Sequence, residues 1–317
     1  MSIDKLSKKS FCHLSKGNRR LTLTPMNLPD DQVSAVLLGI MQDGGLPHIG
    51  CRCSRCAAAY QQPQHAAYAA CLAVVDKRRG HSEVWLIDAT PDIKWQVDMV
   101  ADELGPHPRR PDRLRQPHGI FLTHAHMGHI GGLPQLGPEA MAVEQLPVYA
   151  TAGLVSLLKA TPLWQPAVSR LDLKPMAAGE PVNLAPELTI SPLAVPHRDE
   201  WGVGTVAYII RGPRRSLLYL PDIDAWEQWP EAEVTLSAVD VSLVDASFYS
   251  RAELGGRDPV AHPLVIDTVR RFAHVPGQLV LTHFNHSNPV LDKNSPERKH
   301  VIKAGAVLAS EGMSFRL

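Results

Sequence analysis

The feature that most constrains the fold is residues 119–133, GIFLTHAHMGHIGGL, where an apolar stretch leads directly into three closely spaced histidines. Alternate side chains of an extended segment point the same way, so His124 and His126 can reach one ion. His129 follows a turn at Gly128, near the start of an expected helix, and would face the same cavity. Neutral imidazole is a common ligand of zinc, iron and nickel. Three unrelated histidines on a surface loop are the alternative, but this spacing directly after a strand favours a metal site.

Further histidines and carboxylates follow other apolar runs, at the points where predicted strands give way to polar loops. Individually, each fits a surface position, but their repetition predicts one cluster. The residues concerned are His197, Asp222, Asp224, His283 and His286.

Hydrophobic patterning predicts a strand-rich chain with interspersed helices. No linker or internal repeat divides it, which indicates one layered α/β domain over residues 33–317 behind a flexible tail, residues 1–32. The expected strands are 33–40, 70–76, 82–90, 119–124, 147–150, 187–195, 205–212, 216–222 and 278–283. The expected helices are 92–105, 262–274 and 295–310.

Composition narrows the class of partner. Lys+Arg and Asp+Glu are balanced at 32 each, so the sequence does not favour a nucleic-acid partner. The chain has no apolar run of the roughly 18 residues that a membrane span needs, and its basic start lacks a secretory apolar region. We therefore expect a cytoplasmic protein with a small-molecule substrate and no membrane partner; a homodimer is left open.

The order His-x-His-x-x-His, then a later His, Asp and His, each after a strand, resembles the metallo-β-lactamase-fold hydrolases. The resemblance covers roughly residues 33–290 and implies a four-layer αββα sandwich with the metal site at one edge of the two sheets. It implies a first metal held by His124, His126 and His197, and a second held by His129 and His283, with Asp222 bridging both. Asp88, in VWLIDAT, matches the buried aspartate that orients the histidine loop; a helix cap is the alternative.

Finer motifs, among them QDGGLPHIGCRCSRC, VPHRDEWG and HFNHSNP, resemble the pyrroloquinoline-quinone biosynthesis B family. The Cys-x-Cys-x-x-Cys segment is also similar to the cyclic-phosphate phosphodiesterases of phosphonate breakdown, in which three cysteines and a late histidine hold a structural zinc. On that resemblance, Cys51, Cys53 and Cys56 need a fourth ligand to close a tetrahedron. His286 is the first candidate and His48 the second. A redox-active thiol trio is the competing interpretation.

Gly128 departs from the hydrolase pattern, which has there an aspartate that binds the second metal. The second ion could bind more weakly with an extra water, or another carboxylate such as Asp43 could replace the missing ligand. A single ion in a two-histidine, one-carboxylate setting would suit non-haem iron better than zinc.

The function expected from this pattern is hydrolysis of a small-molecule ester or phosphodiester by a metal-activated water, with one or two active-site ions of zinc, manganese, nickel or iron. Asp222 would help to hold the nucleophile, while Asp43 or His262 would shuttle protons. An iron-dependent oxygenase in cofactor biosynthesis and a non-catalytic metal carrier remain as alternatives. Residues expected either to hold an anionic substrate or to be plain solvated surface are Arg198, Arg257 and Asp258.

Overall fold

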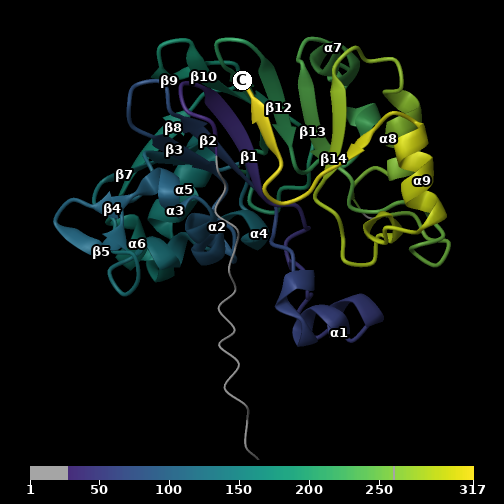
Figure 1. Ribbon diagram of the computed structural model, residues 1–317, viewed down its shortest axis with the longest axis horizontal. Helices are drawn as coiled ribbons and strands as arrows, with labels where there is room; N and C mark the ends of the chain where they lie inside the picture. The colour runs from purple at the N-terminus through teal and green to yellow at the C-terminus, as the bar shows by residue number, and fades with distance from the viewer. Residues whose placement is uncertain (1–27, 260) are drawn as a thin grey trace, which may run out of the picture.

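A computed structural model describes residues 28–259 and 261–317, so residues 1–27 of the expected tail lie outside the described part. Two seven-stranded sheets face each other, with helices on their outer sides (Figure 1), which confirms the four-layer αββα sandwich. Leu28, within the expected tail, is buried, and its carbonyl accepts a hydrogen bond from Lys77.

The first sheet has the strand order β16-β1-β2-β3-β6-β7-β8. Its strands are β1 (Val33–Gly39), β2 (Cys71–Asp76), β3 (Glu83–Ile87), β6 (Gly119–Phe121), β7 (Leu146–Thr151), β8 (Leu171–Met176) and β16 (Ser314–Arg316). The helices beside it in Figure 1 are α2 (Ile93–Met99), α3 (Ala101–Leu104), α4 (Met127–Ile130), α5 (Ala152–Ala160) and α6 (Gln165–Val168).

The second sheet has the order β15-β14-β13-β12-β11-β10-β9. Its strands are β9 (Val182–Ala185), β10 (Leu188–Ala194), β11 (Val206–Arg211), β12 (Ser216–Leu220), β13 (Val241–Asp245), β14 (Gln278–Thr282) and β15 (Val307–Leu308). The helices beside it are α7 (Ala232–Ser237), α8 (Val265–Arg271) and α9 (Pro296–Lys303). Outside both sheets lie helix α1 (Ser54–Gln61) and the hairpin of β4 (Pro106–His107) and β5 (Arg110–Leu114).

Alternation along the strands separates the two cores. In β1, Ala35 and Leu37 pack between the sheets, whereas Val36 and Leu38 pack under the helices of the first sheet. This is the period-two pattern of a strand with both faces covered. Cys71 lies in the helix-side core and is fully buried, as expected of a small apolar residue.

Strand direction brings the polar loops together. Strand β3 runs parallel to β6, and β12, β13 and β14 run parallel to one another, so their carboxyl ends open toward common edges of the sheets. The sheets are joined there, because Val206 N donates to the carbonyl of Thr123 at 3.0 Å. The loops that follow these strands carry most of the predicted site residues.

All three predicted helices were too long, and the one expected over 262–274 forms only α8, Val265–Arg271. The 92–105 helix is broken at Val100, whose φ of −107° and ψ of 21° are not helical, and α2 and α3 flank it. The closing helix ends at Lys303 rather than 310: Gly305 takes a φ of +86°, and Val307 and Leu308 then pair with β14. A left-handed glycine is a common helix stop.

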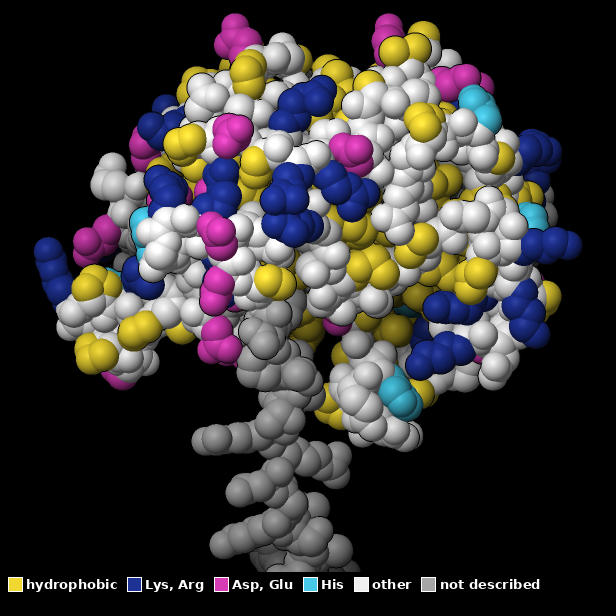
Figure 2. All heavy atoms as spheres, turned by 45° about the horizontal axis from the view of Figure 1, so that its top comes forward, with side chains coloured by type: hydrophobic (Ala, Val, Ile, Leu, Met, Phe, Trp, Pro, Cys, Tyr) yellow, Lys and Arg dark blue, Asp and Glu magenta, His cyan; other side chains and the backbone are white. Residues whose placement is uncertain are grey.

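The C-terminal strand β16 pairs with β1 and covers that edge of the first sheet (Figure 1, yellow beside purple). Lys and Arg side chains and Asp and Glu side chains both occur across the face in Figure 2, as the equal counts in the sequence predict. Among the described residues, no helix is both long and apolar enough to cross a membrane.

Candidate metal centre

The histidine loop leaves β6 in an extended conformation. His126, with a φ of −65° and a ψ of 146°, stands directly before α4, which carries Gly128 and His129. Asp88, at the end of β3, fixes the loop by accepting hydrogen bonds from the Thr123 backbone N–H (2.8 Å) and hydroxyl (2.9 Å). Its Oδ2 also lies 2.7 Å from His129 Nδ1, so Asp88 occupies the orienting position that the sequence predicts.

Three histidines form the first group of potential ligands. His126 Nδ1 lies 3.0 Å from His124 Nε2 and 3.2 Å from His197 Nε2. His126 therefore turns Nδ1 to the group, and its Nε2 lies 2.9 Å from a carboxylate oxygen of Glu200. Three imidazole nitrogens at these separations could hold one divalent ion.

The second group contains His129, His283 and Asp43. Asp43 Oδ1 is 3.3 Å from His129 Nε2 and 3.7 Å from His283 Nε2. Asp222 stands between the two groups, with Oδ2 2.9 Å from His129 Nε2 and Oδ1 3.8 Å from His197 Nε2. The structure thus brings together the six residues that the resemblance assigned to two metals, together with Asp43.

The donor set fits metal ions rather than a hydrogen-bonded polar cluster. His129 Nε2, His283 Nε2 and Asp222 Oδ2 are buried, and none makes a hydrogen bond of regular geometry with a described residue, although His129 Nε2 lies 2.9 Å from Asp222 Oδ2. Buried polar atoms are rarely left unpaired, so three that converge on one point indicate a shared cation. Histidines that bind metals use one nitrogen for the ion and anchor the other.

Two hydroxyl groups, those of Thr123 and Ser247, determine which ring nitrogen of a neighbouring histidine is free to bind a metal ion. The Thr123 hydroxyl donates to Asp88, so it accepts the proton of His124 Nδ1 at 2.9 Å and leaves His124 Nε2 with a lone pair. The hydroxyl of Ser247 donates to Asp245 and accepts from His283 Nδ1 at 3.0 Å in the same way. In both His124 and His283, the unprotonated Nε2 is therefore the nitrogen that can bind a metal ion.

The histidines and carboxylates inside the cluster shift one another's pKa values. Burial alone raises the pKa of Asp222, but His283 and His129 lower it well below its ordinary range. Burial lowers the pKa of His283, and the carboxylates of Asp222, Asp245 and Asp43 together more than reverse this and raise it to about 10. In the metal-free cluster, protons and cations therefore compete for the same nitrogen atoms.

His262 lies beside this cluster, in contact with a carboxylate that the sequence analysis missed. Its Nδ1 is 2.7 Å from Asp245 Oδ2 and 3.7 Å from Asp222 Oδ1, and both Asp245 and His262 are buried. Asp245 comes directly at the end of the apolar strand VSLVD, the same signal that identified Asp222, so it could have been found.

The rim carries few of the predicted substrate groups. Arg198 Nε is 3.9 Å from Glu200, and Trp201 has its ring 6.4 Å from that of His126. Arg257 and Asp258 instead bond within their own loop, Arg257 to the carbonyl of Leu254 and Asp258 to Arg251. Asp224 lies 2.9 Å from His197 Nδ1, on the side of that ring away from His126.

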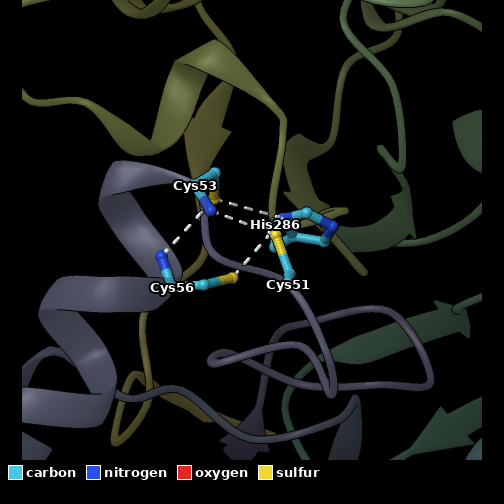
Figure 3. Close-up of side chains that lie close together, drawn as sticks. All are labelled: Cys51, Cys53, Cys56 and His286. Carbon is cyan, nitrogen blue, oxygen red and sulfur yellow. Dashed lines mark hydrogen bonds between the residues drawn. The ribbon is translucent and has the colours of Figure 1, made fainter.

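The cysteine segment forms a separate site with His286 (Figure 3). His286 Nδ1 is 3.9 Å from the sulfur of Cys51, 3.8 Å from that of Cys53 and 3.6 Å from that of Cys56. The alternative ligand His48 is not in this group; its ring lies 4.8 Å from that of His286. The side chain of Arg55 in α1 donates to the carbonyl of His286 and ties the two segments together.

Each cysteine sulfur accepts one backbone N–H. The donors are Cys53 N to Cys51 (3.4 Å), Cys56 N to Cys53 (3.5 Å) and His48 N to Cys56 (3.4 Å). The hydrogen bond from Cys56 N lowers the pKa of the Cys53 thiol, whereas burial raises that of Cys56 to about 11. Three sulfurs with amide donors and one imidazole are the donor set of a closed structural zinc site.

Comparison with known proteins agrees with this geometry. A family model for the β-lactamase superfamily domain matches residues 84–284. The chain is 27% identical over 312 residues to Coenzyme PQQ synthesis protein B of Methylobacterium radiotolerans, covering 89% of this chain and 99% of that protein. It is also 27% identical over 315 residues to the protein of the same name in Methylobacterium nodulans, covering 90% and 100%.

Two solved structures show the same fold. One is the Zn2+-bound PqqB from Methylobacterium extorquens, with a TM-score of 0.76 and 22% identity, over 90% of this chain and 100% of that one. The other is a diphosphatase from the PhnP family, with a TM-score of 0.67 and 20% identity, over 90% and 97%.

Proposed function

The chain belongs to the β-lactamase superfamily, and on this premise we propose that it is a metal-dependent hydrolase of a small-molecule ester or phosphodiester. The observation that carries the proposal is the convergence of unpaired buried atoms from His129, His283 and Asp222 beside a second group of three histidines. A carrier protein would not require two adjoining donor sets around a shared carboxylate.

The chemistry follows from what each residue can do. A divalent ion held here supplies a bound water of lowered pKa and positive charge beside the scissile group. Asp222 turns one oxygen toward each group of histidines, so it can help to hold the nucleophile between the two groups. Arg198, which lies 3.9 Å from Glu200, is the group that would contact an anionic substrate, and the nearby Trp201 has its ring 6.4 Å from that of His126.

His262 is suited to move a proton at Nε2. Its Nδ1 faces Asp245, and Asn285 donates to the Gln42 oxygen, so the amide nitrogen of Gln42 is turned to His262 Nε2 at 3.2 Å. The lone pair of Nε2 accepts that N–H, so Nε2 can take up a proton once the amide nitrogen of Gln42 turns away. We assign to it the uptake and return of a proton during hydrolysis.

A second candidate function has its own support. The relatives that the chain matches over most of its length carry the name Coenzyme PQQ synthesis protein B. The corresponding proposal is an iron-dependent oxidation in the synthesis of a cofactor, on the same fold. Metal identity separates the two candidates, because zinc, manganese or nickel suits hydrolysis and iron with oxygen suits oxidation.

The test combines metal content with turnover. Protein purified without added metal is analysed for its elements, then assayed on bis(p-nitrophenyl) phosphate and p-nitrophenyl acetate. We expect hydrolysis of at least one of the two, with a loss on the order of 100-fold or more in His126→Ala. His81→Ala, an exposed histidine outside the cluster, is the matched control and keeps full activity. Bound iron with oxygen consumption and no hydrolysis would support the second candidate instead.

A further inference from the structure

Position 128 and Asp43 compete for the same space. A Cβ built on Gly128 would lie 2.4 Å from both Cγ and Oδ1 of Asp43, and 2.5 Å from its Cβ. No side chain fits at position 128 while Asp43 holds this conformation. The carboxylate of Asp43 therefore stands where a side chain of residue 128 would project.

The same carboxylate faces the second histidine pair. Asp43 Oδ1 lies 3.3 Å from His129 Nε2 and 3.7 Å from His283 Nε2, two buried nitrogens that make no regular hydrogen bond within the described part of the chain. Its side chain is 42% exposed, whereas those of His129 and His283 are at most 1% exposed. Asp43 thus closes the solvent side of a group whose other members come from the interior.

The backbone holds Asp43 there. Gln42 N donates to the carbonyl of Phe284 at 2.9 Å, and Phe284 N donates to the carbonyl of Ile40 at 2.8 Å. These two bonds pair the segment before Asp43 with the residue next to His283. The placement of the carboxylate relative to the histidine is therefore built into the fold.

We propose that Asp43 is the carboxylate ligand of the second metal, and that glycine at position 128 is what admits it. This inference rests on the proposed function only in taking the cluster to hold two ions. The ligand comes from the loop after β1 instead of from the histidine loop. The second site therefore keeps two imidazoles, Asp222 and one further carboxylate, a complete donor set for a divalent ion.

Relocating the ligand tests the proposal. Metal content and Zn2+ affinity are measured by elemental analysis and titration calorimetry on the full chain and on Asp43→Asn, Asp43→Ala and the double variant Asp43→Gly/Gly128→Asp. Loss of a partner to a ligand weakens metals by about 10–100-fold, so loss of the ligand itself should weaken the second ion on the order of 100-fold or more. The double variant should regain much of that affinity. Asp98→Asn, an exposed aspartate on α2, should bind as the unmodified chain does.

The outcomes are distinct. Unchanged stoichiometry and affinity in both Asp43→Asn and Asp43→Ala would overturn the proposal, as would an unmodified chain that holds one ion in the histidine cluster. Thermal unfolding reports whether each variant is folded, and recovery in the double variant argues for ligation even if the single variants are unstable. If the unmodified chain binds two cluster ions but hydrolyses neither probe, the proposed function fails while the assignment of Asp43 stands.

Discussion

The substitution Asp88→Asn tests how much the orientation of the His129 ring contributes to metal binding, because it leaves His129 itself in place. Asp88 is fully buried and has a φ of +72°, a conformation that asparagine tolerates better than most residues, so the backbone can stay in place. A carboxylate only accepts hydrogen bonds, so His129 Nδ1, at 2.7 Å, carries the proton and Nε2 keeps its lone pair for the ion.

Asparagine reverses this arrangement. If its oxygen accepts the Thr123 N–H, its NH2 group faces His129 Nδ1 and favours the tautomer with the proton on Nε2, the nitrogen 2.9 Å from Asp222. Changes of such supporting partners cost about 10–100-fold in metal affinity. We therefore expect the second ion to bind more weakly by about 1.4–2.7 kcal/mol, with the first ion less affected.

Zn2+ titration of metal-free protein, against a chelator of known affinity, measures both ions. Asp76→Asn is the matched control, because Asp76 is also buried and charged but pairs with Arg78. Equal affinity for both ions in Asp88→Asn and the unmodified chain would refute the tautomer argument. Equal weakening in Asp76→Asn would show a general effect of stability instead.

Three further predictions concern other parts of the chain. Cys53→Ser should remove about one metal per chain in elemental analysis and lower the Tm by on the order of 5 °C or more; unchanged values would end the structural-zinc interpretation. His126→Ala should keep the cysteine-bound metal in the same elemental analysis while turnover is lost; an active variant would mean that His126 is not a ligand. Burial raises the pKa of Glu311 from 4.5 to about 8, so its stabilising contribution is full below pH 4.5 and is lost as pH rises through 8. At about 1.4 kcal/mol for each pH unit, the loss is at most about 5 kcal/mol. Denaturant unfolding of Glu311→Gln should lack this decline, and a decline equal to that of the unmodified chain would disprove it.

Residues next to one another in the sequence were the easiest to predict. His124, His126 and His129 lie at one cavity because an extended segment followed by a helix start leaves little choice of direction. Asp222, His197 and His283 were predictable for a similar reason, because each follows an apolar run that indicates the end of a strand. The predicted helices were too long: no residue type in the sequence marks the break at Val100, whereas Gly305, a common helix stop, does give a local signal for the end of α9.

Contacts between residues far apart in the sequence could be identified only in the folded chain. The sequence offered both His48 and His286 as partners for the cysteines, and the structure places His286 beside the three sulfurs. It also left open whether any carboxylate would replace the aspartate absent at Gly128. The strand-end position of Asp245 is a local signal like that of Asp222, but its pairing with His262 is visible only in the folded chain.

The sequence by itself located the histidine loop and the cysteine site, because close spacing fixes side-chain directions over a few residues, and the resemblance of its motifs indicated the fold family. Only the tertiary structure decided which distant groups meet. Asp43 reaches the cluster because its segment pairs with the one beside His283, and because Gly128, with no Cβ, leaves the space that the carboxylate fills. Such approaches depend on the packing of two sheets, and no stretch of sequence contains that information alone.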